Sequence, residues 1–322
     1  MKKVKVGLVG AGGMGRIRAR WLAENVRVVL SAVCDSTEEA KAITREYQAR
    51  FYSDYRKFLR EGEFEAVILS VPNRWHFSMA IEALDTYRHV LVEYPIALTI
   101  NQAEQMLTLA KKKGLILHPG HTMRFEAQHL ATKENLSRIG RMIFATGYIW
   151  YGREMSRWYG DPVLRGDTFT FLNYHHVDQF RDLFGRVEWL EGVLDERKNE
   201  SGKLSMASGT IMLKFVNGGC AFSLQGHGIL APSTASKYIV GEKGYLEFKG
   251  TEGQGGLFLL SEKQREEINF PQNDPYKIDT DNFVREILGE QKILVPPEEA
   301  LETLRICQLA VQSAREGRRI YV

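Results

Sequence analysis

The chain has 322 residues, of which 44% are hydrophobic and 26% charged, so it is long enough for two packed domains and is neither disordered nor fibrous. A formal net charge of +3 and the absence of any basic run longer than residues 111–113 disfavour a nucleic-acid partner. Cys34, Cys220 and Cys307 are too far apart for a metal site or a disulfide framework, and no apolar run has the length of a membrane span. We therefore expect a cytoplasmic protein without a metal and without membrane contact.

A glycine-rich turn follows the first predicted strand, residues 4–9. Residues 10–15 have the pattern G-x-G-x-x-G and open a predicted helix, whose first N–H groups and dipole can bind a pyrophosphate. Gly10 permits the tight turn, Gly12 lets the backbone approach the phosphates, and Gly15 lets helix and strand pack closely. The pattern predicts a dinucleotide site formed by Gly10, Gly12, Gly13, Met14 and Gly15.

Asp35 follows the second predicted strand, residues 28–34. It comes about 20 residues after Gly15, the spacing of a carboxylate that binds the ribose hydroxyls of a dinucleotide. Its negative charge would repel a 2′-phosphate, and neither Ser36 nor Thr37 is an arginine that could neutralise one. NAD is therefore favoured over NADP as the cofactor.

The first part of the chain alternates strands with helices, which is typical of a doubly wound parallel sheet, and we predict an NAD(P)-binding Rossmann domain over residues 1–121. Thr99 and Gln102 fit a capping box at the start of a helix that ends at Gly114. Because ligands bind at the carboxyl ends of parallel strands, the segments after these strands should converge on one crevice. Further predicted strands are 65–71, 89–93 and 115–118, and further predicted helices are 37–47 and 75–86.

In residues 122–322 predicted strands no longer alternate with helices. This pattern predicts an α+β domain with a large, mainly antiparallel sheet that binds the substrate. Residues 216–219, Val-Asn-Gly-Gly, predict a hairpin turn. The exposed face of an open sheet is commonly covered by another subunit, so we expect a homodimer or homotetramer formed through this sheet. The predicted strands are 142–150, 187–194, 206–215, 220–225, 237–240, 245–248 and 257–260, and the predicted helices are 168–184, 281–288 and 297–316.

Several motifs, taken in order along the chain, resemble those of the Gfo/Idh/MocA family of oxidoreductases, and the resemblance covers almost the whole chain. These motifs are residues 10–15, Asp35, Val71-Pro72-Asn73 with His76, residues 89–95, Arg124-Phe125 and His175-x-x-Asp178. The resemblance implies hydride transfer between nicotinamide and a sugar, a cyclitol or a related carbonyl or hydroxyl compound. It also implies cofactor contacts from Val71, Asn73, His76 and Glu93.

The chain departs from the family pattern in two motifs. The usual Glu-Lys-Pro is replaced by Glu93-Tyr94-Pro95, a variant similar to the segment of biliverdin reductases. The usual Asp-x-Gly-x-His-x-x-Asp has Phe171 and Asn173 in place of its first aspartate and its glycine. A bilin reductase, an NAD-dependent glycosidase and a dinucleotide-binding sensor without turnover are therefore alternative functions.

Tyr94 is the first candidate catalytic residue. A phenol has an ordinary pKa of about 10, so near neutral pH it is a hydrogen-bond donor. We expect Tyr94 to donate to a substrate oxygen that becomes an alkoxide while the cofactor delivers hydride. The alternative is a phenol that only fills the floor of the crevice.

His175 is the second candidate acid or base. On a helix, Asp178 lies three residues further along the same face, where it can orient the imidazole and raise its pKa. His176 points elsewhere and is expected to be structural. Asp167 lies too far from His175 to replace the missing carboxylate and is expected to cap a helix start instead.

The candidate substrate contacts are Arg124, Trp158 and Tyr174. Arg124 follows a strand end, where it could bind a substrate oxygen or tie the two domains together. Trp158 lies in a predicted loop and offers a flat surface on which a sugar ring or a bilin could stack. The nicotinamide is expected to meet Tyr94 and His175 across one cleft.

Overall fold

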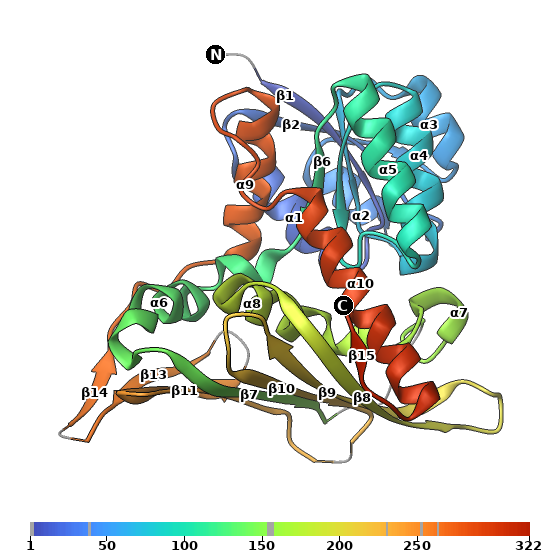
Figure 1. The fold of residues 1–322 in the computed structure, drawn as a ribbon. Coiled ribbons are helices and arrows are strands. Elements are labelled where there is room, and N and C mark those ends of the chain that lie inside the picture. Colours follow the sequence, from blue (N-terminus) through green and yellow to red (C-terminus); the bar gives the residue numbers. More distant parts are fainter. Residues whose placement is uncertain (1–2, 38–39, 153–157, 230, 252–253, 263) are drawn as a thin grey trace. The chain divides into compact units, whose positions relative to one another are not determined.

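The computed structural model describes residues 3–37, 40–152, 158–229, 231–251, 254–262 and 264–322, and the chain divides into two compact units (Figure 1). Unit 1 comprises Met1–Thr122 and Asp274–Glu302, and unit 2 comprises Met123–Asn273 and Thr303–Val322. The predicted second domain includes Asp274–Glu302, whereas this segment packs with unit 1. Within the described residues, no helix has both the length and the apolar character needed to cross a bilayer.

Unit 1 contains a six-stranded sheet in the order β3-β2-β1-β4-β5-β6, and every neighbouring pair is parallel. Val6, Leu8, Ile68 and Leu91 are fully buried, as expected for strands that helices cover on both faces. The predicted doubly wound fold is confirmed. The strands are β1 (Val4–Val9), β2 (Val28–Cys34), β3 (Arg50–Tyr52), β4 (Ala66–Leu69), β5 (His89–Glu93) and β6 (Leu117–Gly120).

Local capping signals determine where several helices of unit 1 begin and end. The predicted Thr99 cap is confirmed, because Thr99 Oγ1 accepts a hydrogen bond from Gln102 N at 3.2 Å. The Gln102 side chain accepts from Leu98 N at 3.2 Å, one residue before the N-cap that a capping box would use. Gly114, with φ of 65°, ends this helix. The helices are α1 (Gly13–Glu24), α2 (Ala40–Glu46), α3 (Tyr55–Glu61), α4 (His76–Asp85), α5 (Ile100–Lys113) and α9 (Pro275–Ile287).

Some elements of unit 1 differ from the prediction. The short strand β3 and helix α3 are not predicted, and β6 begins two residues later than the predicted strand at 115–118. Helix α9 begins at Pro275 instead of 281, because Asp274 Oδ1 accepts hydrogen bonds from the N–H groups of Tyr276 and Lys277 at 2.9 and 3.1 Å.

Helix α9 belongs to unit 1 because its apolar face completes the core of that unit. Phe283 and Val284 are fully buried in one cluster with Val4 and Leu22. Figure 1 shows α9 beside α1, on the other side of the sheet from α4 and α5. A segment far along the chain therefore supports the helix that begins at the glycine turn.

Unit 2 contains a nine-stranded sheet in the order β14-β13-β12-β11-β7-β10-β9-β8-β15. Neighbouring strands are antiparallel except β7 and β10, which run parallel, so the predicted mainly antiparallel sheet is confirmed. The predicted hairpin turn holds Gly218 and Gly219 at φ of 93° and 73°. The strands are β7 (Met142–Tyr151), β8 (Val187–Lys198), β9 (Leu204–Phe215), β10 (Cys220–His227), β11 (Thr234–Gly241), β12 (Gly244–Thr251), β13 (Gln254–Leu260), β14 (Arg265–Ile268) and β15 (Ile320–Tyr321).

The helices of unit 2 include α6 (Ala127–Asn135), α7 (Pro162–Arg165) and α8 (Tyr174–Phe184), and α6 and α8 lie on one face of the sheet (Figure 1). A π-helical turn, Phe169–Asn173, precedes α8, so the predicted helix 168–184 is α-helical only in its second part. The final helix α10 (Pro297–Glu316) matches its prediction, and the boundary between the units falls within it. Strands β14 and β15 and helix α7 are not predicted.

Candidate functional site

Gly10 and Gly15 are required by the protein's own backbone. Gly10 has φ of +90°, and a Cβ at this position would lie 2.2 Å from the carbonyl oxygen of Ser70. A Cβ at Gly15 would lie 1.9 Å from the carbonyl oxygen of Gly10. Any side chain at either position would force the turn and the strand end apart.

Gly12 and Gly13 have no such structural reason to be glycine. Both are exposed, and a Cβ at either position would meet no atom within 4 Å. Helix α1 begins here with no side-chain hydrogen bond at its N-cap and no acidic residue in its first turn. Its first N–H groups and positive dipole end are therefore available to an anion, and the space above them admits close approach of a phosphate.

Asp35 is held beside the glycine turn by short hydrogen bonds. Its Oδ2 accepts from Ala11 N at 2.6 Å, and its Oδ1 accepts from Thr37 N at 2.7 Å and from Thr37 Oγ1 at 2.8 Å. The carboxylate is half-buried and fixed at the carboxyl end of β2. The first N–H groups of α1 and the carboxylate of Asp35 fit a dinucleotide. The glycine turn would face its diphosphate, and Asp35 would face a ribose.

His76 connects two strand-end loops. Its Nδ1 lies 2.7 Å from the carbonyl oxygen of Pro95 and its Nε2 lies 2.9 Å from that of Val71. Burial lowers the pKa of His76, and the two backbone contacts oppose that shift only in part. Because both ring nitrogens face backbone carbonyls, His76 positions the loops after β4 and β5. Asn73 is buried at the start of the 3₁₀ turn Asn73–Trp75, which lies in the loop after β4.

A buried charge network holds Glu93 in unit 1. Arg18 Nε donates to Glu93 Oε1 at 2.7 Å, and Arg18 Nη2 lies 2.7 Å from Asp279 Oδ2. Arg18 Nη1 also donates to Thr280 Oγ1 at 2.9 Å. Burial alone would lower the pKa of Arg18, but the carboxylates of Glu93 and Asp279 outweigh burial and raise it. Glu93 is thereby held by α1 and α9 together.

His118 extends this network. Its Nε2 lies 2.9 Å from Asp279 Oδ1 and its Nδ1 lies 2.8 Å from Glu286 Oε2. Burial lowers the pKa of His118, but the two carboxylates outweigh burial and raise the pKa to about 9. Arg18, His118, Asp279 and Glu286 are not among the site residues predicted from the sequence. Their only sequence signal is a charged or titratable side chain on an otherwise apolar face.

Tyr94 follows β5 directly and is half-buried at the carboxyl edge of the parallel sheet. It stands next to Glu93 in sequence, so the Arg18 network holds the backbone from which its phenol projects. A role in proton donation stays a prediction for this residue.

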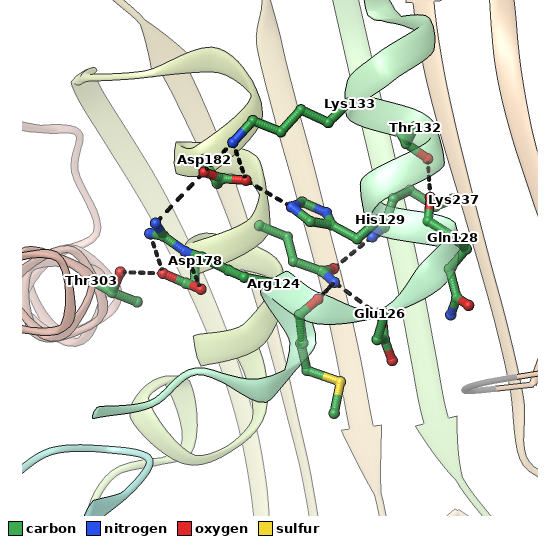
Figure 2. A network of polar contacts seen from close by, with 12 residues as sticks. Arg124, Glu126, Gln128, His129, Thr132, Lys133, Asp178, Asp182, Lys237 and Thr303 are labelled. Carbon is green, nitrogen blue, oxygen red and sulfur yellow. Dashed lines mark hydrogen bonds and ion pairs between the residues drawn. The ribbon is translucent and has the colours of Figure 1, made fainter. Parts of the chain in front are cut away.

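In unit 2, Asp178 is engaged by Arg124 (Figure 2). Arg124 Nε donates to Asp178 Oδ2 at 2.8 Å and Arg124 Nη2 donates to Asp178 Oδ1 at 2.7 Å, while Thr303 Oγ1 donates to Oδ1 at 3.1 Å. The predicted use of Asp178 to orient His175 stays a prediction. Because this strong bidentate pair joins residues of one unit, it gives Arg124 a role in the structure of unit 2.

Asp182 forms the second half of the same network (Figure 2). It accepts hydrogen bonds from His129 Nε2 and Lys133 Nζ, both at 2.8 Å, and lies 3.6 Å from Arg124 Nη1. Burial would raise the pKa of Asp182, but the bonds from His129 and Lys133 outweigh it and lower the pKa to about 2. Asp182 is therefore an anion at any physiological pH.

A pocket of about 50 Å³ lies within unit 2, between the sheet and helix α8. Lys237 Nζ donates to Gln179 Oε1 at 2.6 Å, and Gln179 Nε2 donates to Glu126 Oε2 at 3.2 Å. Burial, followed by the charge of Lys237, lowers the pKa of His176 well below its ordinary value. The lining includes Tyr148, His175, His176, Gln179, Gln225 and Lys237.

The remaining predicted residues have different surroundings. Trp158 is half-buried and meets the ring of Phe171 edge-on, with 5.9 Å between ring centroids. Tyr174 is fully buried, and burial raises its pKa well above the ordinary value. A fully buried phenol cannot contact a substrate directly, so we correct the assignment of Tyr174 from substrate contact to core. Asp167 Oδ1 accepts from Thr170 N at 2.7 Å, which confirms its capping role.

Comparisons with known proteins match both parts of the chain. The model of the oxidoreductase family's NAD-binding Rossmann fold matches residues 4–121, and the model of that family's C-terminal alpha/beta domain matches residues 133–322. The chain is 32% identical over 141 residues to the uncharacterized oxidoreductase YhhX of Escherichia coli (strain K12), covering 43% of this chain and 40% of that protein. It is 26% identical over 185 residues to a 1,5-anhydro-D-fructose reductase of Ensifer adhaerens, covering 54% of this chain and 55% of that protein.

Each of these alignments thus spans less than two thirds of the curated relative's own length. A solved structure of biliverdin reductase from Synechocystis sp. PCC 6803, in complex with biliverdin and NADP+, superposes with a TM-score of 0.90 at 24% identity, covering 97% of this chain and 99% of that one. This likeness establishes a shared fold. From the two family models, the chain belongs to the Gfo/Idh/MocA family of oxidoreductases, and residues 4–121 form its NAD(P)-binding Rossmann fold.

Proposed function

We propose that this protein is an NAD(P)-dependent oxidoreductase that transfers hydride between nicotinamide and a sugar, a cyclitol or a related carbonyl or hydroxyl compound. The observation that carries the proposal is the pair Gly12 and Gly13. The protein's own packing leaves open space at both positions, so it does not explain why they are glycine. The uncapped start of α1 and the fixed carboxylate of Asp35 supply the matching donors and acceptor. Gly10, Met14 and Gly15 complete this turn.

The chain's own residues have distinct roles in this proposal. When bound, the nicotinamide supplies or accepts the hydride. Tyr94 donates a hydrogen bond to the substrate oxygen, which favours the charge that develops there during reduction. His175 is a second proton donor or acceptor in the pocket of unit 2. Glu93, anchored by Arg18, holds the strand end from which Tyr94 projects.

The residues beside the turn support NAD over NADP. The half-buried carboxylate of Asp35 has both oxygens fixed by backbone and Thr37 donors, so it cannot easily turn away from a 2′-phosphate. Calorimetric titration tests the preference. Tighter binding of NADPH than of NADH would overturn it.

The experiment that tests the proposal replaces Gly12 with valine. Because a Cβ here has no heavy atom within 4 Å, G12V should unfold at the same denaturant concentration as the original protein, while NADH affinity falls at least about tenfold. The matched variant is G15A, whose added Cβ would lie 1.9 Å from a carbonyl oxygen and should destabilise the fold. Unchanged NADH binding by folded G12V, or no NADH binding by the original protein, would contradict the proposal.

A bilin reductase is the second candidate function. Two observations favour it, the Glu-Tyr-Pro segment at residues 93–95 and the fold shared with a biliverdin reductase. The half-buried Trp158 offers an aromatic edge to a sugar ring and to a bilin alike. NADH consumption with panels of sugars, inositols and biliverdin separates the two functions.

We also propose a homodimer or homotetramer formed through the sheet of unit 2, in a reducing compartment such as the cytoplasm. The sheet face turned away from α8 carries the exposed side chains Phe144, Val193 and Leu224, whose exposed fractions are 39%, 66% and 41%. The thiols of Cys34, Cys220 and Cys307 are unpaired. Light scattering tests the oligomer, and a monomer at micromolar concentration would contradict it.

A further inference from the structure

His176 of α8 is almost fully buried against the sheet of unit 2, with an exposed fraction of 8%. A Cβ at Gly147 on β7 would lie 3.1 Å from His176 Cε1 and 3.2 Å from its Nδ1, so the missing side chain lets the ring lie against the strand. The ring of Phe180 packs beside the imidazole, with 5.9 Å between ring centroids. From the sequence, His176 is expected to be structural, but its two ring nitrogens have different surroundings.

The Nδ1 atom of His176 ends a chain of hydrogen bonds that begins at Asn173. Asn173 Nδ2 donates to Ser223 Oγ at 2.9 Å, and Ser223 Oγ lies 3.2 Å from His176 Nδ1. Asn173 Nδ2 also donates to the carbonyl oxygen of Gly209 at 2.9 Å. Because a carbonyl oxygen can only accept, this contact fixes the amide with its nitrogen toward Ser223.

Asn173 fits here because of a glycine on the opposite strand. The family pattern has glycine at position 173, whereas this chain has asparagine there and glycine at position 209 of β9. A Cβ at Gly209 would lie 2.3 Å from Asn173 Oδ1. The chain therefore provides, on another element, the space that the larger side chain needs.

The same hydrogen bonds determine which nitrogen of His176 carries the proton. Ser223 is fully buried, and within the described residues its hydroxyl has no acceptor other than His176 Nδ1. Burial, followed by the charge of Lys237, lowers the pKa of His176 well below its ordinary value, so the ring is neutral near neutral pH. A neutral imidazole that accepts at Nδ1 has its proton on Nε2.

The Nε2 atom of His176 is therefore a donor, and among the residues that the structure describes it has no hydrogen-bond partner. His176 lines the pocket of unit 2, as do His175, Gln225 and the carboxylate-bearing Glu126. A buried donor without an acceptor destabilises a protein, because it has lost its bond to water. A ligand oxygen at this position would gain a hydrogen bond that water weakens little.

We infer that His176 binds the substrate by donating a hydrogen bond from Nε2 to a hydroxyl or carbonyl oxygen in the pocket of unit 2. Ser223 and Asn173 are positioning residues that hold the imidazole in this tautomer. His176 selects for an acceptor oxygen and takes no part in proton transfer. The inference rests on the proposed oxidoreductase function for the word substrate, but the donor can be tested by binding and by NMR alone.

The tautomer is tested by nitrogen NMR of the full chain, isotopically labelled at histidine. Nitrogen chemical shifts separate protonated from unprotonated ring nitrogens, and comparison with H176Q identifies the signals of His176 among the eight histidines. We expect the proton on Nε2 alone at neutral pH. S223A should move the two signals toward each other, because the two neutral tautomers can then exchange.

The matched control is S313A, which removes the hydroxyl of an equally buried serine on α10. Ser313 Oγ donates to the carbonyl oxygen of Arg318 at 2.6 Å and does not contact His176. S313A should leave the His176 signals unchanged. A charged ring, a proton on Nδ1, or equal signal changes in S223A and S313A would overturn the inference.

Binding is tested by titrating the original protein with D-glucose, myo-inositol and biliverdin in the presence of NADH. We expect at least one compound to bind and to shift the Nε2 signal of His176. H176L should weaken binding of that compound about tenfold, whereas H176Q should retain most of the affinity because its amide can still donate. If none of the three compounds shifts the Nε2 signal, or H176L and H176Q lose affinity equally, the inference is wrong.

A kinetic split gives a further readout. With the compound that is reduced fastest, H176L should raise KM about tenfold with little change in kcat, because the contact forms equally in the bound substrate and in the transition state. A merely structural imidazole would instead lower the unfolding midpoint in H176L and H176Q alike, with KM unchanged in the folded variants. A fall in kcat at unchanged KM would also overturn the binding role.

These measurements separate the inference from the oxidoreductase proposal. If a compound binds through His176 but NADH neither binds nor is consumed, the donor site stands and the oxidoreductase proposal fails. If NADH is consumed with the same KM and kcat by H176L and by the original protein, the oxidoreductase proposal stands and the role of His176 fails.

Discussion

His118 in unit 1 and His129 in unit 2 are both buried and both contact carboxylates, yet their pKa values shift in opposite directions. Burial disfavours the charged form of each. His118 lies between Asp279 and Glu286, and their negative charges outweigh burial. His129 contacts Asp182, which Lys133 also binds, and the charge of Lys237 adds to the effect of burial. The comparison teaches that two contacting carboxylates outweigh burial at His118, whereas one contacting carboxylate does not outweigh burial and the charge of Lys237 at His129.

The two networks also differ in what they stabilise. In unit 1 the fully buried Arg18 joins α1, β5 and α9, so it supports both the dinucleotide turn and the strand end that carries Tyr94. In unit 2 Arg124 pairs with Asp178 and Asp182 and so joins the segment before α6 to α8, the helix that also carries His175. Each network thus supports the backbone behind a candidate site.

The largest effect is expected from R18M. Removing this guanidinium leaves Glu93 and Asp279 as buried carboxylates without their main cation, which should lower the free energy of unfolding by about 3–5 kcal/mol. Urea denaturation measures the loss. The control is R20M, which removes an exposed ion pair to Asp274 and should cost less than about 1 kcal/mol. Equal losses in R18M and R20M would show that burial of the network adds nothing.

The pH dependence of stability sharpens the comparison above neutral pH. The pKa of His118 is about 9 in the folded protein against 6.5 for the unperturbed group, so its stabilising effect is complete below pH 6.5 and disappears as the pH rises through 9. The loss is on the order of 3 kcal/mol. Unfolding free energies from pH 6 to 10 should show this slope in the original protein and not in H118Q. Parallel curves for the two proteins would refute the charged state of His118.

A smaller effect is expected at the residue next to the unit 1 network. Y94F removes only a phenolic oxygen from a half-buried ring, so NADH affinity should be unchanged. Turnover should fall about tenfold, or about 1.4 kcal/mol in activation free energy, because the substrate oxygen loses a hydrogen-bond donor. Steady-state kinetics on the best substrate checks this. Undiminished turnover would assign Tyr94 to packing.

The smallest effect is expected from H129Q below neutral pH. His129 has a lowered pKa in the folded protein, so the unfolded chain binds its proton first and stability should fall as the pH drops below 6.5. H129Q should lack this contribution while H118Q retains it. If H129Q keeps the full acid slope, the contrast between the two histidines would not hold in solution.

Local patterns predicted most elements to within a few residues. The structure agrees residue for residue with the predicted strands 4–9 and 28–34 and the predicted helix 297–316. A β-branched run and a 3.6-residue apolar period are each contained in one continuous segment, so the local sequence reveals them. Strands β14 and β15 are short edge strands whose pairing depends on neighbours distant in sequence. The π-helical turn at Phe169–Asn173 likewise has no signal in the apolar period.

For the candidate site, prediction succeeded where the functional residues lie in one turn. It failed where they come from segments far apart in the chain. The glycine pattern and Asp35 identify the dinucleotide turn without reference to anything else. Tyr174 was misassigned because the sequence does not reveal that the residue before His175 is fully buried. Arg18 pairs with Asp279, which lies so far along the chain that no local sequence pattern connects the two residues.

The sequence by itself determined the turn, the alternation of strands and helices, and the substitution of tyrosine for the family lysine at position 94. These follow from backbone sterics and from periodicity, which act over a few neighbouring residues. Only the tertiary structure decided which charges are buried together, that α9 returns to unit 1, and that Lys237 shares a pocket with His175. Such facts depend on long-range packing, because electrostatic free energies are set by the surroundings of each charge and not by its place along the chain.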